Sequence, residues 1–218
     1  MQFIHTLKKL YPRPLLLLLI LAWITSSVEA QNDQQKLQNL VGEAQEVSIP
    51  TQSEEEYQSA LKTYKEIEAG LEDVKYENLD LDGQVDYELL KAHIQTNIFE
   101  IETVELYKLH PVSYIQLGAT NKLFIRPGSI ARSGIKEAID ELKQLDVVLE
   151  NAKNNLTNPA RVWTENTLYE IYYAKMMLRD YVPDAVVEDP DLKEELVEAA
   201  DNAYSTIEDF ETWVEDTL

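Results

Sequence analysis

The stretch DPDLKEELVEAADNAYSTIEDFETWV, residues 189–214, decides the fold class of this sequence. Aspartate followed by proline at its start is typical of a helix, because aspartate caps the first turn and proline fits the first helical position. Apolar residues then recur every three or four positions, which is the spacing of one helix face. The members of this stripe are Leu192, Leu196, Ala199, Ala203, Ile207, Phe210 and Val214. The segment therefore predicts a long amphipathic helix.

Stripes of the same period occur upstream. They predict further helices over about 53–76, 82–109, 112–125, 135–156 and 164–182. Ser53 followed by Glu56 forms a capping box for the first of these helices, and Thr164 is the predicted cap of the last. Arg126-Pro127-Gly128 is expected to break the chain. Since no segment shows sustained two-residue alternation, the sequence predicts an all-α fold of five or six mostly antiparallel helices.

The N-terminal segment, residues 1–30, has the layout of a signal peptide. Lys8, Lys9 and Arg13 give a basic start, the apolar run 15–24 follows, and a polar stretch ends at Ala30, after which cleavage is expected. The run is about half the roughly 20 apolar residues that a membrane-spanning helix needs, so no stable anchor is expected after cleavage. The chain has no cysteine, which suits an exported protein of the bacterial periplasm or exterior that carries no disulfide and no lipid-modified cysteine.

The rest of the chain is expected to form one polar lead-in and one domain. Residues 31–50 are polar and rich in glutamine, and they predict a mobile lead-in or a frayed helix. Residues 51–218 form the predicted helical domain. Its last apolar stripe is still running at Val214 and no glycine or proline stop signal follows, so the domain is expected to be incomplete at its C-terminal end.

The chain is strongly acidic, with 19 basic and 40 acidic residues and a formal charge of −21. Residues 1–30 hold three basic residues and one acidic residue, so residues 31–218 carry a charge of −23. A surface this negative repels phosphate backbones and anionic lipids, which argues against nucleic-acid binding. A solvated exterior explains most of this charge. A basic ligand or a divalent cation remains the alternative.

Candidate catalytic residues are sparse. After the predicted signal peptide only His93 and His110 remain, and no His-Glu-x-x-His pair exists. His93 is expected to lie on a helix surface or between helices, and His110 at a helix end, where a cation would complement the helix dipole. No catalytic, cofactor-binding or metal-ligating residue is assigned to this chain.

The segment from Asn78 to Leu89 resembles a calcium-binding loop. Asn78, Asp80, Asp82 and Gly83 match an EF-hand, but Leu89 stands where the bidentate glutamate is required. A turn in which Asp82 caps the following helix is the preferred interpretation, and calcium binding in the Asp80/Asp82 region remains the alternative.

Tyrosine is frequent, with twelve residues. Tyr169, Tyr172 and Tyr173 lie close together on one predicted helix, where half-buried packing is the preferred interpretation and a sugar- or peptide-binding aromatic surface is the alternative. Glu165, Glu170 and Asp180 belong to the same region. General acid and base chemistry would need two such carboxylates at a set separation across a cleft, which sequence alone does not supply.

Three passages resemble the front part of the bacterial domain-of-unknown-function 885 family. They are LDLDGQVDYELL at 79–90, HPVSY at 110–114 and NLTNPARVWT at 155–164, and their order and spacing agree with that family over about 50–218. His110 departs from the acidic residue usual at its position. The resemblance implies a helical layer of a larger zinc-metallopeptidase-like protein, whose His-Glu-x-x-Pro-Gly-His-His motif would lie downstream of this chain. Zinc is therefore implied only for a full-length relative.

Two functions follow as hypotheses. The chain is either the substrate-channel or lid segment of an exported metallopeptidase-like hydrolase, or a non-enzymatic periplasmic helical module that binds a peptide or protein partner. In the first case its partner is the C-terminal part of the same protein, and whether the chain belongs to an enzyme stays open.

Overall fold

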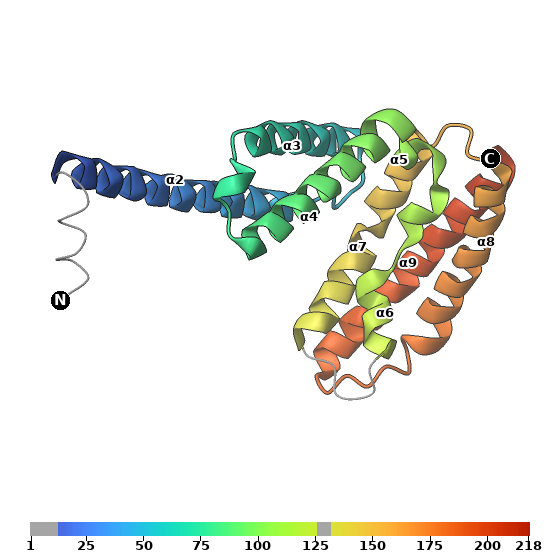
Figure 1. The fold of residues 1–218 in the computed structure, drawn as a ribbon. Coiled ribbons are helices and arrows are strands. Elements are labelled where there is room, and N and C mark those ends of the chain that lie inside the picture. The colour runs from blue at the N-terminus through green and yellow to red at the C-terminus, as the bar shows by residue number, and fades with distance from the viewer. Residues whose placement is uncertain (1–12, 126–131) are drawn as a thin grey trace. The chain divides into compact units, whose positions relative to one another are not determined.

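The computed structural model describes residues 13–125 and 132–218, and confirms the all-α fold, because the described part consists of helices and connecting loops (Figure 1). Its α-helices are α2 (Arg13–Glu46), α3 (Glu54–Glu72), α4 (Leu81–Ile98), α5 (Leu106–Leu109), α6 (Gly118–Ile125), α7 (Arg132–Asn155), α8 (Arg161–Met176) and α9 (Pro190–Thr217). Short 3-10 helices, η1 (Tyr76–Asn78) and η3 (Pro111–Ile115), and π-helical segments, η2 (Phe99–Val104) and η4 (Met177–Tyr181), join them.

The described part therefore holds eight α-helices instead of five or six. One reason is that the helix predicted over 82–109 is divided. After α4 the chain forms the π-helical segment η2. The helix ends at Glu105, because this residue has a left-handed φ of 51°, and α5 begins after it. The segment predicted as a helix over 112–125 likewise divides into η3 and α6.

The chain forms two compact units where the sequence predicted one domain over 51–218. Unit 1 consists of residues 1–47 and 61–99, and unit 2 of residues 48–60 and 100–218.

In unit 1, residues 31–46 belong to α2, so the structure has a helix here, the second of the two alternatives predicted for this range. Leu37 is fully buried and Ala44 is buried in the unit's core. The carboxylate of Asp33 is buried as well and accepts a hydrogen bond of 2.7 Å from the side-chain amide of Asn78. A few apolar positions thus suffice to pack a polar helix when its neighbours satisfy its buried polar groups.

The cap of α4 is Asp80, and the prediction that Asp82 caps this helix is wrong. The Asp80 carboxylate accepts a hydrogen bond of 2.8 Å from the backbone N–H of Gly83, three residues into the helix. Gly83 is itself buried, and a Cβ at this position would lie 2.5 Å from the side-chain oxygen of Gln34 on α2. Glycine therefore allows the close approach of these two helices.

The predicted cap at Ser53 is confirmed. The backbone N–H of Glu56 donates to the Ser53 hydroxyl at 3.2 Å. The Glu56 carboxylate accepts from the backbone N–H of Thr51 at 3.0 Å, two residues before the position that a capping box would use.

Unit 2 is built around α6, α7, α8 and α9, which lie side by side (Figure 1). All seven stripe residues of α9 are buried, with exposed fractions of 5% or less. Asp189 caps this helix as predicted, accepting hydrogen bonds from the backbone N–H groups of Asp191 and Leu192. The apolar stripe of α7 packs against α9 and completes the core.

The start of α8 differs from the prediction. Thr164 lies buried inside the helix, which begins at Arg161 after Ala160. The turn closes through backbone hydrogen bonds from Trp163 and Thr164 to the carbonyl of Ala160, so no side-chain cap is used.

The N-terminus of α6 is capped by a carboxylate from another helix. Glu141 of α7 accepts hydrogen bonds of 2.8 Å from the backbone N–H groups of Ala119 and Thr120 and from the Thr120 hydroxyl. Since α6 is short, this carboxylate fixes where the helix lies along α7.

Glu141→Ala is expected to lower the free energy of unfolding of unit 2 by about 1–2 kcal/mol, because the first turn of α6 loses its cap. Urea unfolding followed by tryptophan fluorescence measures this change. Glu137→Ala, an exposed glutamate on the same helix, is the matched control and should change stability little. Equal effects of the two substitutions would contradict the capping role.

Two sequence expectations fall largely outside the described residues. Residues 1–12, which include the basic Lys8 and Lys9, and the predicted break at Arg126-Pro127-Gly128 are not described. Within the described helices, none combines the length and the hydropathy that crossing a membrane requires.

Candidate functional site

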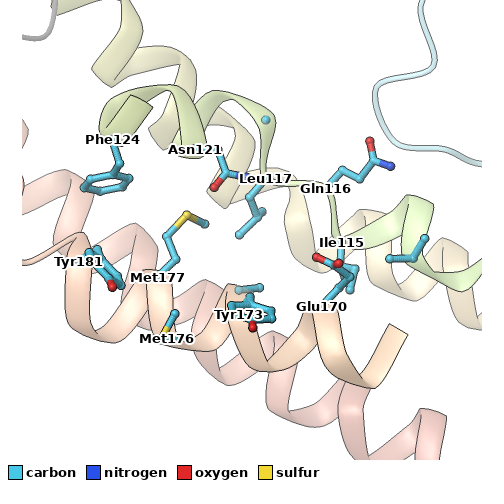
Figure 2. Close-up of a pocket in the computed structure, with 13 residues that line it drawn as sticks. Ile115, Gln116, Leu117, Asn121, Phe124, Glu170, Tyr173, Met176, Met177 and Tyr181 are labelled. Atoms are coloured by element: carbon cyan, nitrogen blue, oxygen red, sulfur yellow. The ribbon is translucent and has the colours of Figure 1, made fainter. Parts of the chain in front are cut away.

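Unit 2 contains a pocket of about 540 Å³ between the η3–α6 segment and the α8–η4 segment (Figure 2). Its walls are apolar and aromatic, with a few polar groups among them. The lining residues are Val112, Ile115, Gln116, Leu117, Gly118, Asn121, Phe124, Glu170, Tyr173, Ala174, Met176, Met177 and Tyr181. A site of this size and lining suits an organic ligand or a short stretch of polypeptide.

The wall formed by α8 and η4 depends on the change from α to π geometry at Met177. The backbone N–H of Val182 donates to the carbonyl of Met177 at 3.0 Å, which is an i to i−5 bond. Beyond it, the ammonium group of Lys193 donates to the carbonyls of Val182, Pro183 and Ala185 at 3.1, 2.6 and 2.6 Å. Burial lowers the pKa of Lys193. This lysine satisfies the carbonyls that the helix end leaves open.

An aromatic surface continues from the pocket over the outside of unit 2. We call it the tyrosine patch, and its members are Phe124, Tyr169, Tyr172, Tyr173 and Tyr181. Their exposed fractions are 37%, 58%, 61%, 40% and 51%. The α8 tyrosines are thus about half exposed and lie away from the core, which other residues of α8, such as fully buried Ile171, face. An exposed aromatic patch of this kind is a common feature of binding surfaces.

The rings of the patch contact one another and hold its shape. Tyr173 makes edge contacts with Tyr169 and Tyr172, at centroid distances of 4.8 and 5.5 Å. Phe124 of α6 lies 6.2 Å from Tyr181 of η4, so the two walls of the pocket meet at this ring pair. The hydroxyls of Tyr169 and Tyr173 are 2.7 Å apart, and this hydrogen bond raises the pKa of Tyr173. Tyr173 is therefore neutral at physiological pH.

Glu170 is the single charged residue among those that line the pocket. Within the described part of the chain its exposed carboxylate has no hydrogen-bond or ion-pair partner, whereas Glu165 pairs with Arg161 at 2.7 Å and Asp180 with Arg179 at 3.1 Å. These last two carboxylates do not line the pocket. The three acidic residues of this region thus do not come together as a pair across the cleft, and the pocket offers one negative charge in an aromatic setting.

The two histidines lie in different units. In unit 1, the ring of His93 makes an edge contact with Tyr64 at 6.0 Å, and its backbone carbonyl accepts from Asn97. In unit 2, half-buried His110 ends α5 and contacts Trp163 edge-on at 5.2 Å. His110 thus lies at a helix end as predicted, and burial lowers its pKa below the ordinary 6.5, so the ring is neutral near pH 7.

The lowered pKa of His110 makes stability depend on pH. Between the folded-state pKa and 6.5 the unfolded state binds more protons, so the free energy of unfolding should rise as pH rises through that window and fall as pH drops. His110→Gln should flatten this part of the profile. Urea unfolding at several pH values between about 5.5 and 7.5 measures how the free energy of unfolding changes with pH, both in the unchanged chain and in the variant. An unchanged slope in the variant would assign the effect to other groups.

No metal site gathers within residues 13–125 and 132–218, where no group of three or more histidine, aspartate or glutamate side chains converges. Two residues of the calcium-loop pattern bond to other groups. The carboxylate of Asp80 caps α4, and the side-chain amide of Asn78 donates a hydrogen bond to Asp33.

Sequence reasoning identified Tyr173 and Glu170 but not the other side of their pocket. Phe124, Met177 and Tyr181 received no functional interpretation, because their roles depend on α6 lying beside η4. The signal available was the density of exposed aromatic residues between 169 and 181, which predicts a surface but not its partner.

Comparison with known proteins shows one likeness in fold. No family model matches the chain, and no curated protein matches it. A solved structure from Shewanella oneidensis, provisionally described as a lipoprotein of unknown function, matches 88% of this chain with a TM-score of 0.67 and 16% identity. The chain spans 36% of the length of that structure.

Proposed function

We propose that this chain is a helical binding segment that holds a stretch of polypeptide in the tyrosine-lined pocket of unit 2. The observation that supports this proposal is the combination of a pocket of about 540 Å³, lined by apolar, aromatic and polar side chains, with the exposed tyrosine patch beside it. Aromatic side chains give a large contact area at a low cost in conformational entropy, and tyrosine hydroxyls and side-chain amides can bond a peptide backbone. Gln116 and Asn121 supply such amides.

Binding of a neutral peptide tests this function. The probe is a short fluorescein-labelled peptide with leucine and phenylalanine spaced by glutamine, titrated with the full chain and followed by fluorescence anisotropy. Saturable binding is expected, and Asn121→Trp, which fills the pocket from α6, should abolish it. Lys136→Trp on the exposed face of α7 is the control and should bind as the unchanged chain does. Binding that survives Asn121→Trp would contradict the proposed site.

A second candidate is the substrate-channel or lid segment of a metallopeptidase-like hydrolase, which the resemblance to the domain-of-unknown-function 885 family implies. The chain matches about a third of a longer solved structure, which favours the view that it forms one helical layer of a larger protein. In that case the same pocket would hold the peptide substrate and the zinc would be bound elsewhere. The chain alone should then neither bind zinc stoichiometrically nor cleave peptides, which calorimetry and a peptidase assay measure. Either activity in the isolated chain would contradict this assignment.

Export is part of the same proposal. The layout of residues 1–30 supports it, and the description of the Shewanella structure as a lipoprotein is consistent with it. The product recovered from the periplasm of a bacterial host should begin at Gln31, which N-terminal sequencing determines. A product that keeps residues 1–30 and stays in the cytoplasm would contradict this location.

A further inference from the structure

We infer that the pocket of unit 2 prefers a basic amphipathic segment, one in which lysine or arginine follows apolar residues. This inference rests on the proposed function and adds the chemical class of the ligand. Its starting point is the charge distribution of the pocket, where Glu170 is the one formal charge among the lining residues and has no partner within the described part of the chain.

The carboxylate of Glu170 and the ring of Tyr173 both line the pocket, and both come from α8 (Figure 2). An ammonium or guanidinium group placed between them would meet a negative charge and the face of an electron-rich ring. A cation–π contact at an exposed site and an exposed ion pair each contribute weakly, so together they support a preference of several-fold. The cations of α8 and η4 are already paired, since Arg161 bonds Glu165, Lys175 bonds Glu211 and Arg179 bonds Asp180.

The apolar side chains that line the pocket determine the apolar part of the ligand. Met176 and Met177 line the pocket together with Leu117 and Ile115, and methionine adapts its shape to irregular apolar side chains. The charge of the whole chain acts in the same direction, since −21 attracts basic segments and repels acidic ones over a distance of about a Debye length. An apolar segment with basic neighbours therefore fits the site better than a neutral or an acidic one.

Three short peptides test the inference. They share the same leucine and phenylalanine positions and carry lysine, glutamine or glutamate at the others, and their affinities for the full chain are measured by fluorescence anisotropy. The lysine peptide is expected to bind about three- to tenfold more tightly than the glutamine peptide, and the glutamate peptide most weakly. Glu170→Gln should remove most of the lysine preference, measured as the ratio of the affinities of this variant for the lysine and glutamine peptides.

Glu165→Gln is the matched control, because this glutamate lies on the same helix and is exposed but does not line the pocket. It should keep the lysine preference. If both substitutions reduce the preference equally, the basic peptide adsorbs to the acidic surface in general and the inference is overturned. If the glutamine and lysine peptides bind equally, the proposed function stands and the inference fails. If no peptide binds, the proposed function itself fails.

Discussion

Phe210→Ala should lower the free energy of unfolding of unit 2 by about 3–5 kcal/mol, which is the range for removing a phenylalanine from a packed core. The Phe210 side chain is fully buried on the stripe of α9 and stacks on Trp213 at a centroid distance of 5.6 Å. Its loss leaves a cavity among α7, α8 and α9, which cannot collapse without moving long helices.

Urea unfolding followed by tryptophan fluorescence measures this loss, since Trp163 and Trp213 both belong to unit 2. Tyr172→Ala, at a side chain that is 61% exposed, is the control and should change stability by less than about 0.5 kcal/mol. A small effect of Phe210→Ala, comparable to that of the control, would mean that α9 does not organise the core.

Tyr173→Ala should weaken binding of the neutral glutamine peptide by tenfold or more, on the order of 1.4–2 kcal/mol, because tyrosines at the centre of an interface contribute most of its energy. Tyr173 lines the pocket and contacts both Tyr169 and Tyr172, so its removal opens one wall and loosens the patch.

Titration with the glutamine peptide, followed by fluorescence anisotropy, measures this loss of affinity. Tyr76→Ala is a matched control, because Tyr76 is 39% exposed and Tyr173 is 40% exposed, but Tyr76 lies in unit 1. The control should leave the affinity unchanged. If the two substitutions weaken binding equally, the peptide does not occupy the pocket of unit 2.

The long helices were predictable because their signals are local. The α9 stripe and its Asp189 cap lie within one continuous segment, and so does the Ser53 cap of α3. The division that adds α5 was not predictable, since the left-handed conformation of Glu105 has no glycine to mark it, and α2 is the other additional helix. Residues 31–46 were underestimated because few apolar positions mark this part of α2 in the sequence, whereas Leu37 and Asp33 are buried by neighbours that sequence alone does not place.

The candidate site was predictable only in part. Tyr169, Tyr172 and Tyr173 were recognised as a group, but their spacing did not decide between packing and exposure. The exposure of the tyrosines depends on which face of α8 meets α9, and the core there includes Ile171 of α8 and Leu178 of η4. The opposite wall comes from α6, more than forty residues earlier, and is placed by the Glu141 cap.

The most direct test of the binding proposal is methyl NMR of the full chain labelled with ¹³C at the methionine methyl groups. The chain has three methionines, of which Met176 and Met177 line the pocket and Met1 lies outside the described residues. On titration with the glutamine peptide, the Met176 and Met177 signals are expected to move and saturate together. Saturable binding by anisotropy without movement of these two signals would place the ligand elsewhere and contradict the account.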